Sequence, residues 1–360
     1  MVGAPLPDPG FWAGKRVLVT GHTGFKGSWM ALWLERMGAE VVGLALAPET
    51  SPNLFEAVSP ITGMDSHIVD LSDEAGLNAV VKGSKVDLAI HMAAQPLVRR
   101  SYREPIETFR ANALGTALLL EALRSVDTLK AALMITTDKV YRNLDDGRDF
   151  LETDPLGGFD PYSASKAAAE MAIASWAASF FAPKGIPVAS ARGGNVIGGG
   201  DWSEDRLVPD LWRAKQNREA VVLRNPNSTR PWQHVLDAVA GYLLFVEALA
   251  QRGDETPRAL NFGPPAGDTL TVGEVATSMV AALGSNQGWR HDASEQPHEM
   301  KLLSLDPTLA MNTIGWRPRL AGPDALAWSA SWYKAFDEGQ DPKGLVGEQI
   351  ERYLTLPPAF

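Results

Sequence analysis

Three glycines at fixed spacing, placed between a strand pattern and a helix pattern, constrain the fold of this chain more than any other feature. An apolar run at residues 16–20 predicts a strand, G-x-x-G-x-x-G follows it directly, and residues 28–37 carry apolar side chains at helical spacing. Such glycines permit a tight turn and let backbone N–H groups at the helix N-terminus approach a pyrophosphate. We therefore predict a dinucleotide site. Its expected contacts are the residues of this turn: Gly21, Thr23, Gly24, Phe25, Lys26 and Gly27.

The rest of the first half alternates strand and helix patterns. This alternation predicts βαβ units with right-handed crossovers, and strands that are apolar almost throughout predict a parallel sheet covered on both faces. The expected fold class is α/β, with a Rossmann-like, doubly wound parallel sheet. The further strands expected are Val41–Leu46, His67–Val69, Asp87–Met92, Ala131–Thr136 and Pro187–Arg192, and the long helices expected are Pro105–Ser125 and Lys166–Phe181.

Length and texture predict a second lobe. The chain has 360 residues, which exceeds the usual size of one core. After residue 198, loops rich in Gly, Pro, Asn and Asp separate short helical pieces. We expect residues 1–193 to form mainly the dinucleotide-binding domain and residues 194–360 mainly a smaller C-terminal lobe that binds the substrate, with the chain crossing between the two.

Composition excludes several classes of protein. The chain has no cysteine, which rules out disulfides and thiolate metal sites, and its six histidines are scattered, so no metal site is expected. A net charge of −10 disfavours nucleic acid as a partner. No uncharged apolar run reaches the roughly 18 residues of a membrane span, and the first residues lack the apolar segment of a signal peptide. We expect a cytoplasmic protein with no membrane contact.

The end of the second expected strand bears on the choice of dinucleotide. An acid that binds the adenine ribose is usual there, but Ala47 takes this place, with Glu49 as a displaced candidate. Residues 43–56 contain no Lys or Arg to neutralise a 2′-phosphate, so the pattern favours NAD over NADP. Asp70, which ends the third expected strand, is placed either to bind the adenine amino group or to cap the strand end.

A candidate reactive centre follows the fifth expected strand. Tyr162 and Lys166 lie one turn apart on a predicted helix. An ammonium stabilises a nearby tyrosinate, so we expect Lys166 to lower the pKa of Tyr162 toward the range of a general base. The strand itself ends in Thr136-Thr137-Asp138-Lys139, which brings further polar side chains to the same edge of the sheet.

Together these motifs resemble the extended short-chain dehydrogenase/reductase family, from residue 15 to about residue 332. Thr137-Asp138-Lys139 is similar to the Thr-Asp-(Glu or Lys) signature of the nucleotide-sugar 4,6-dehydratases in that family, and the Lys resembles the branch that acts on CDP-glucose. The other stretches that carry the resemblance are GHTGFKG (21–27), PNLF (52–55), AAQPLV (93–98), GNVIGGGDW (194–202) and RPWQH (230–234).

The resemblance implies NAD as cofactor and CDP-glucose as substrate. It implies that Tyr162 removes the proton of the sugar 4-hydroxyl, that Thr137 bonds the same oxygen and that Lys166 holds the nicotinamide ribose. Lys139, uncharged through burial beside Lys166, would take the C5 proton, and Asp138 would protonate the departing 6-hydroxyl. The division of roles between Asp138 and Lys139 is open at this point. The product would feed the deoxyhexoses of bacterial surface polysaccharide.

Further binding residues are expected from strand ends and from the resemblance. For the cofactor they are Asp70, Leu71, Ala93, Ala94, Gln95 and Asn112. For the substrate they are Gln95, Val98, Arg99, Asn195, Arg206, Leu207, Val208, Arg230, His234 and Glu299. Three of these have an alternative interpretation. Asn112 is equally typical of a satisfied core amide, His234 of packing between lobes and Glu299 of a surface loop.

Several alternatives stay open. A sibling dehydratase would use dTDP-glucose or GDP-mannose, a 4-epimerase would oxidise C4 without needing Asp138, and a non-catalytic dinucleotide sensor would not need Tyr162 and Lys166 together. The resemblance also implies a homodimer that pairs the two long helices with those of a second copy. The apolar and small residues expected to supply this surface are Leu118, Leu119, Leu120, Ala168, Ala172 and Trp176.

Overall fold

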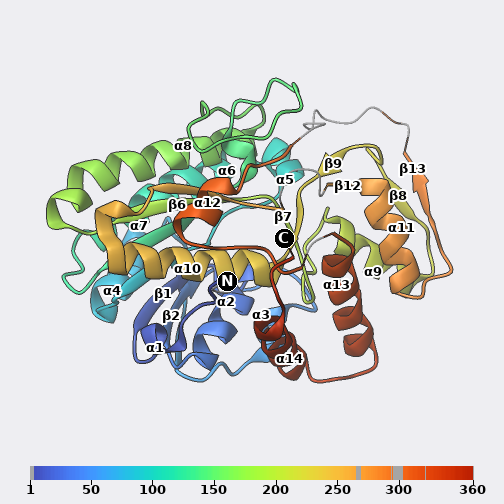
Figure 1. The fold of residues 1–360 in the computed structure, drawn as a ribbon, viewed down its shortest axis with the longest axis horizontal. Coiled ribbons are helices and arrows are strands. Elements are labelled where there is room, and N and C mark those ends of the chain that lie inside the picture. The colour runs from blue at the N-terminus through green and yellow to red at the C-terminus, as the bar shows by residue number, and fades with distance from the viewer. Residues whose placement is uncertain (1–3, 265–268, 293, 295–302, 321, 360) are drawn as a thin grey trace.

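The computed structural model describes residues 4–264, 269–292, 294, 303–320 and 322–359. Its centre is a seven-stranded sheet in the order β11-β6-β5-β4-β1-β2-β3, and every neighbouring pair is parallel (Figure 1). The predicted α/β, Rossmann-like fold is confirmed. The strands are β1 (Arg16–Thr20), β2 (Glu40–Ala45), β3 (Met64–Ile68), β4 (Leu88–His91), β5 (Ala131–Ile135), β6 (Val188–Gly193) and β11 (Ala259–Phe262).

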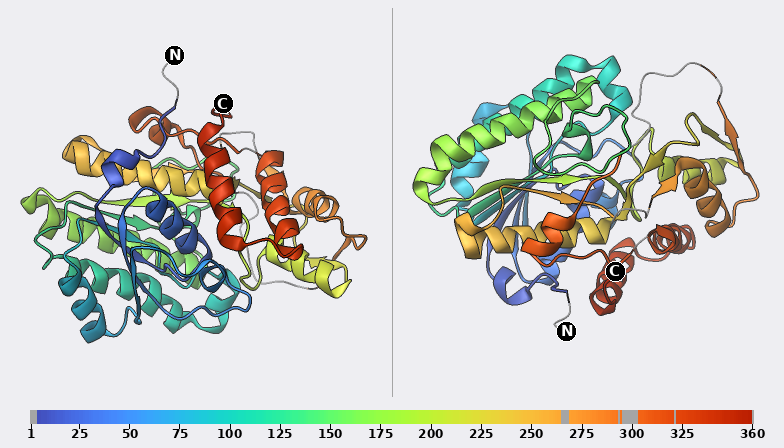
Figure 2. Two further views of the ribbon diagram at one scale, coloured as in Figure 1. Left: turned by 90° about the horizontal axis from the view of Figure 1, so that it is seen from below. Right: turned by 45° about the horizontal axis from the view of Figure 1, so that its top comes forward.

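Helices cover both faces of this sheet (Figures 1 and 2). Residues of β5 show why both faces are apolar: Leu133 and Ile135 pack into one core, and Ala132 and Met134 into the other. The first core includes α2 (Phe25–Arg36) and α10 (Val235–Arg252), and the second includes α4 (Glu74–Ser84), α7 (Gly115–Leu123) and α8 (Pro161–Trp176).

Some predicted elements differ from those observed. The third strand begins at Met64 rather than His67, because it is an edge strand whose polar, half-exposed residues give no apolar run. The helix expected over residues 105–125 is divided by a π-helical turn, Arg110–Leu114, between α6 (Pro105–Phe109) and α7. A second π turn, Ala177–Phe181, extends α8.

A smaller lobe lies beyond the carboxyl edge of the sheet, on the right in Figure 1. The chain enters it after β6 and returns to the main sheet with α10 and β11, a strand that the sequence pattern did not predict. The remaining strands pair two by two: β7 (Asn195–Ile197) with β10 (Trp232–His234), β9 (Thr229–Arg230) with β12 (Leu270–Thr271), and β8 (Val221–Leu223) with β13 (Trp289–His291). The remaining α-helices are α1 (Pro9–Trp12), α3 (Leu54–Val58), α5 (Val98–Arg103), α9 (Leu207–Asn217), α11 (Val272–Ala282), α12 (Thr308–Thr313), α13 (Gly322–Asp337) and α14 (Pro342–Thr355).

Within the described ranges, no helix is long and apolar enough to cross a membrane. No group of three or more His, Asp or Glu side chains in the same ranges is arranged to hold a metal ion.

Candidate active site

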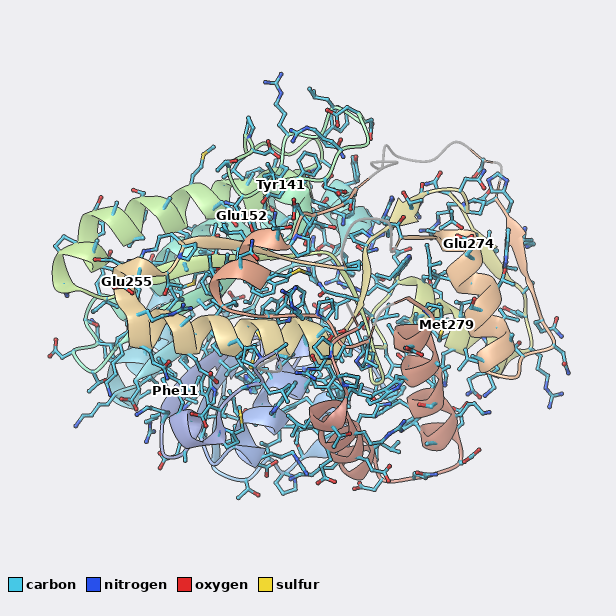
Figure 3. All side chains as sticks on the ribbon, viewed as in Figure 1. Phe11, Tyr141, Glu152, Glu255, Glu274 and Met279 are labelled. Atoms are coloured by element: carbon cyan, nitrogen blue, oxygen red, sulfur yellow. The ribbon has the colours of Figure 1, made fainter. Side chains whose placement is uncertain are left out.

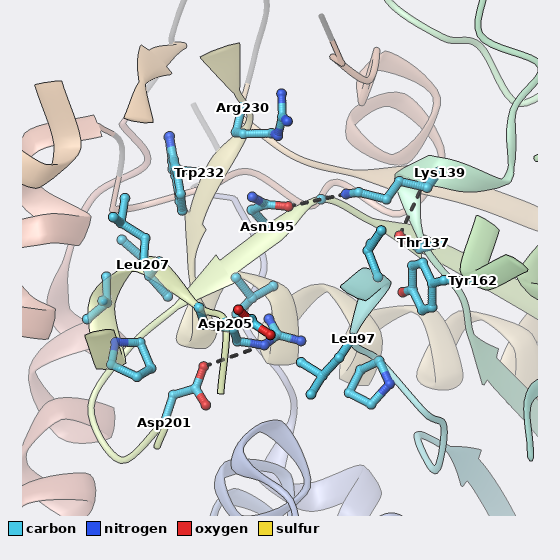
Figure 4. Close-up of a pocket in the computed structure, with 18 of the residues that line it drawn as sticks. Leu97, Thr137, Lys139, Tyr162, Asn195, Asp201, Asp205, Leu207, Arg230 and Trp232 are labelled. Atoms are coloured by element: carbon cyan, nitrogen blue, oxygen red, sulfur yellow. Dashed lines mark hydrogen bonds and ion pairs between the residues drawn. The ribbon is translucent and has the colours of Figure 1, made fainter. Parts of the chain in front are cut away.

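The carboxyl ends of the central strands open into a cavity of about 330 Å³. This is the edge at which open α/β sheets bind ligands. Figure 4 shows Thr137, Lys139 and Tyr162 on one side of the cavity, Leu207 and Trp232 on the other, and Asn195 between them. The predicted site residues that line it are Lys26, Ala94, Val98, Arg99, Thr137, Lys139, Tyr162, Lys166, Asn195, Arg206, Leu207, Val208 and Arg230.

The glycine turn at the end of β1 has the shape that a dinucleotide pyrophosphate needs. Gly21 has φ +74°, and a Cβ there would lie 2.7 Å from the backbone nitrogen of Ala93. A Cβ on Gly27 would collide with the backbone of Gly21, so only glycine allows this close approach of helix and strand. Gly24 caps α2 without a side-chain hydrogen bond, which leaves the first N–H groups of the helix for a phosphate.

Tyr162 and Lys166 project from the first turns of α8. A capping box between Asp160 and Ser163 fixes the start of this helix. Burial raises the pKa of Tyr162 to about 12, although a hydrogen bond with Thr137 acts in the opposite direction. The expected lowering of this pKa is therefore wrong, because desolvation of the hydroxyl and the charges of Asp138 and Asp160 raise it.

Lys166 is buried against the end of β5. Its Nζ donates a hydrogen bond to the carbonyl oxygen of Ile135 at 3.0 Å. Burial lowers the pKa of this ammonium to about 8, while the charge of Glu170 raises it. Lys166 thus follows Tyr162 by one helical turn and also lines the cavity.

Thr137, Asp138 and Lys139 form a tight turn directly after β5. Oδ1 of Asp138 accepts hydrogen bonds from Oγ1 of Thr137 at 2.8 Å and from Nζ of Lys139 at 3.1 Å. Lys139 also lies 3.4 Å from Oδ1 of Asn195. The neutral state that the sequence analysis expects of Lys139 stays a prediction, and the structure places its Nζ 3.1 Å from Oδ1 of Asp138.

Asp138 lies behind the cavity wall rather than in it. Its side chain is fully buried, and Oδ2 has no hydrogen-bond partner among the described residues. The carboxyl group is linked to the cavity by its hydrogen bonds with Thr137 and Lys139, which both line the cavity.

A buried polar network supports α8 from behind, and sequence reasoning missed it. Glu170 accepts hydrogen bonds from Thr136, Ser190 and Arg192. Arg192 also donates to the hydroxyl of Tyr141 and to the carbonyl oxygen of Glu152, both labelled in Figure 3. The sequence did contain a signal for this network: Glu170 follows Lys166 by four residues, as Lys166 follows Tyr162, so the three lie on one helix face.

Gln95 and Asn112 were predicted as ligand contacts, but the structure gives both amides protein partners. The amide of Asn112 bonds the backbone N–H and C=O of Gln95 at 2.8 and 3.1 Å and the hydroxyl of Ser165 at 2.9 Å. The Gln95 side chain bonds the backbone of Leu97 and the hydroxyl of Thr108. These contacts tie the loop after β4 to α8, and neither residue lines the cavity.

Asp70, Leu71 and His234 also do not line the cavity. Asp70 is exposed and accepts a hydrogen bond from the backbone of Ser72, as a strand-end cap does. Leu71 is buried in the core. His234 is fully buried and caps α10 through Nδ1. Glu299 lies outside the described residues.

At the adenine end of the predicted dinucleotide site lies a positive charge, that of Arg100, which the sequence pattern did not predict. Glu49 pairs with Arg100 of α5 at 2.8 Å, and Arg100 also contacts Glu204 at 3.2 Å. The carboxylate of Glu49 is therefore paired with Arg100. The charge of Arg100 is balanced by the two carboxylates of Glu49 and Glu204.

Comparison with known proteins now decides the family. The model of the NAD dependent epimerase/dehydratase family matches residues 17–263. The chain belongs to this family. The predicted family resemblance is confirmed, and NAD, which the family name specifies, is the cofactor that the glycine turn fits.

Three known proteins illustrate the similarity. CDP-glucose 4,6-dehydratase of Salmonella typhimurium is 44% identical, over 97% of this chain and 98% of its own length. dTDP-glucose 4,6-dehydratase of Streptomyces niveus is 28% identical, over 89% of this chain and 93% of its own. The solved UDP-glucose 4-epimerase of Stenotrophomonas maltophila, with bound NAD and formylated UDP-arabinopyranose, superposes with a TM-score of 0.77 and 22% identity, over 91% of this chain and all of its own.

The cofactor preference can be tested directly. We expect the cofactor-free protein to bind NAD more tightly than NADP. Residues 43–56 supply no Lys or Arg for a 2′-phosphate, and Arg100 is already paired with Glu49 and Glu204. Calorimetric titration of both dinucleotides measures the difference. Tighter binding of NADP would contradict this expectation.

Proposed function

We propose that this enzyme dehydrates CDP-glucose to CDP-4-dehydro-6-deoxyglucose. The observation that carries the proposal is the hydrogen-bonded turn of Thr137, Asp138 and Lys139, set beside Tyr162 and Lys166 at the cavity. The similarity to the Salmonella CDP-glucose 4,6-dehydratase over nearly the whole chain supports it.

The first step is oxidation at C4 of the sugar. Loss of water across C5 and C6 is difficult until C4 is a ketone, because only then is the C5 proton acidic. Tyr162 takes the proton of the 4-hydroxyl, and Thr137, which already bonds the Tyr162 hydroxyl, bonds the same sugar oxygen. When bound, NAD supplies the reversible hydride exchange that removes hydrogen from C4 and returns it at C6.

The elimination step needs a base at C5 and an acid at the 6-hydroxyl. An ammonium and a carboxylate are the wrong forms for these roles, but Lys139 and Asp138 share a hydrogen bond of 3.1 Å. Transfer of one proton along this bond from Nζ to Oδ1 gives a neutral amine and a carboxylic acid. Lys139 then removes the C5 proton, and Asp138 returns a proton to the departing oxygen, so that water leaves and no net charge is created in the cavity.

Delivery of that proton requires a small rearrangement, because Asp138 is buried behind Lys139 and Thr137. If the carboxyl group rotates toward the cavity, Asp138 gives the proton to the 6-hydroxyl directly. If it does not rotate, the proton moves first to Lys139 and from there to the 6-hydroxyl. In both cases Asp138 and Lys139 act as one pair.

A 4-epimerase is the second candidate, since a UDP-glucose 4-epimerase shares the fold. An epimerase returns hydride to C4 and needs no acid for a leaving hydroxyl. The Asp138–Lys139 pair therefore favours the dehydratase. The presence of both Tyr162 and Lys166 at the cavity argues against a non-catalytic sensor.

Incubation of the NAD-loaded protein with nucleotide sugars tests the proposed function. We expect CDP-glucose to yield a 4-keto-6-deoxy product, detected by mass spectrometry as loss of one water. dTDP-glucose and GDP-mannose, tested at the same concentration, identify a sibling dehydratase if either reacts faster. Formation of CDP-galactose without loss of water would establish the epimerase instead.

We also propose that the enzyme is a homodimer through the outer face of α6, the following π turn and α8. Ile106, Leu114 and Met171 are 73, 51 and 61% exposed on these elements, which is a large apolar surface for helices that already cover a sheet. Leu119 and Leu120, which the sequence assigned to this surface, are instead fully buried against the sheet, because the helix turns them inward.

Charge placed on this surface is expected to separate the dimer. The double variant Ile106→Glu and Met171→Glu introduces two charges on each side of a two-fold interface, so it should give the mass of one chain in light scattering at micromolar concentration. Leu144→Glu, at an equally exposed apolar residue in a loop, is the matched control and should keep the wild-type mass. A single-chain mass for the wild-type protein would overturn the dimer.

A further inference from the structure

We propose that Asp205 and Arg224 together read the cytosine of the substrate and exclude uracil and thymine. This inference rests on the proposed function, because it takes the ligand to be a cytidine nucleotide sugar. It concerns the end of the cavity formed by α9, β8 and the residues next to them, which sequence reasoning left without a base-recognition residue.

Apolar residues at this end of the cavity provide surfaces for a flat ring. Leu207 and Val208 come from the first turn of α9, and Val221 and Leu223 from β8, which packs against α9. Stacking and apolar contact against such surfaces hold any pyrimidine equally well. Discrimination among pyrimidines requires polar groups at the ring edge.

Asp205 and Arg224 supply those polar groups side by side. Nη2 of Arg224 donates to Oδ1 of Asp205 at 2.8 Å, and both side chains remain accessible from the cavity, with exposed fractions of 32 and 20% for Arg224 and Asp205. Arg99, at 4.0 Å from the same oxygen, adds a second positive charge. Among the described residues, none donates a hydrogen bond to Oδ2 of Asp205.

The order of hydrogen-bonding groups in this pair matches cytosine. The cytosine edge presents an amino donor at N4, followed by acceptors at N3 and O2. A carboxylate beside a guanidinium presents an acceptor followed by donors, which is the complementary order. Uracil and thymine have a carbonyl at C4 and an N–H at N3, so both contacts would face a like partner, oxygen against oxygen and N–H against N–H.

The other carboxylates of the cavity wall are already engaged. Asp160 caps α8 through Ser163. Asp201 accepts two hydrogen bonds from Ser203, and Asp210 is paired with Arg213 of its own helix. Asp205 is the lining carboxylate whose only described partners are cations that a base can also contact.

Asp205→Asn tests the proposal with little risk to folding. Asp205 has φ +54°, a conformation that Asn adopts about as readily as Asp, and the substitution keeps size and shape. We expect kcat/KM for CDP-glucose to fall about 10- to 100-fold, and kcat/KM for UDP-glucose to stay constant or rise. Asp210→Asn, at another carboxylate of the cavity wall, is the matched control and should leave the ratio of the two substrates near its wild-type value.

Binding of CDP and UDP to the NAD-loaded protein, measured by calorimetry, gives a readout that does not depend on turnover. A preference for CDP that disappears in Asp205→Asn and persists in Asp210→Asn supports the inference. Equal binding of CDP and UDP by the wild-type protein would overturn it, and so would a preference that Asp205→Asn leaves intact.

The same measurements separate this inference from the proposed function. If the wild-type protein prefers CDP through Asp205 but does not dehydrate CDP-glucose, the proposed function fails and the base recognition stands. If it dehydrates CDP-glucose and Asp205→Asn keeps the wild-type ratio of substrates, the base is read elsewhere and only this inference fails.

Discussion

Tyr162→Phe is expected to fold normally and to lose oxidation at C4 by at least about 10²- to 10⁴-fold, the usual contribution of a general base. The variant removes one hydroxyl oxygen from a side chain that is buried at the start of α8, and the ring contacts remain. Tyr162 is the proposed base for the 4-hydroxyl, so reduced nicotinamide should not form when CDP-glucose is added. Absorbance of reduced nicotinamide and the amount of keto product measure the two consequences.

The pH dependence of the same step is informative. Burial raises the pKa of Tyr162 to about 12, so only a minute fraction is tyrosinate near neutral pH, and C4 oxidation is expected to rise with pH. Tyr102→Phe, at a half-exposed tyrosine of α5 outside the cavity wall, should keep both the rate and its pH profile. Activity of Tyr162→Phe within a few-fold of wild type would remove Tyr162 from the mechanism.

Asp138→Asn is expected to separate dehydration from oxidation. The amide keeps the shape of the carboxyl group but cannot accept the Lys139 proton or pass one to the leaving 6-hydroxyl. Tyr162, Lys166 and the glycine turn are unchanged, so oxidation at C4 should proceed and then stop. The variant should therefore accumulate a 4-ketohexose and bound reduced nicotinamide, whereas the wild-type protein should show little of this absorbance because hydride returns promptly to C6.

Lys139→Met should stall at the same stage, because the proton pair is proposed to act as a unit across the 3.1 Å hydrogen bond. Methionine has a side chain of similar length but no group that can accept or donate a proton. If Asp138→Asn still binds substrate but forms no reduced nicotinamide, Asp138 serves the oxidation step. Turnover of Asp138→Asn near the wild-type rate would contradict the four-residue site of Thr137, Asp138, Lys139 and Tyr162 and favour an epimerase.

The sequence predicted those features that depend on local spacing. The glycine turn, the apolar strands and the turn of Thr137, Asp138 and Lys139 each lie within a few residues, and the parallel sheet brings their ends to one edge by the geometry of βαβ units. For this reason the fold class was predicted correctly, and several predicted site residues, among them Thr137, Lys139 and Tyr162, line the cavity.

The features that the sequence did not predict depend on contacts between distant segments. Asp205 and Arg224 are 19 residues apart, and only the packing of the smaller lobe joins them. β11 is short and follows a long helix, so its place beside β6 has no local signal. Gln95 and Asn112 are polar residues near the site in sequence, yet they bond one another, and pattern reasoning does not tell which polar group faces a ligand and which faces the protein.

The fate of the hydrogen on C4 tests the central claim most directly. CDP-glucose that carries deuterium at C4 is incubated with the NAD-loaded enzyme, and the position of the label in the product is determined by mass spectrometry and deuterium NMR. Oxidation by way of Tyr162, elimination by Asp138 and Lys139 and return of the same hydride predict a 4-keto product with the deuterium on C6. Recovery of the deuterium at C4 of an epimerised sugar, or on the released cofactor, would contradict the account.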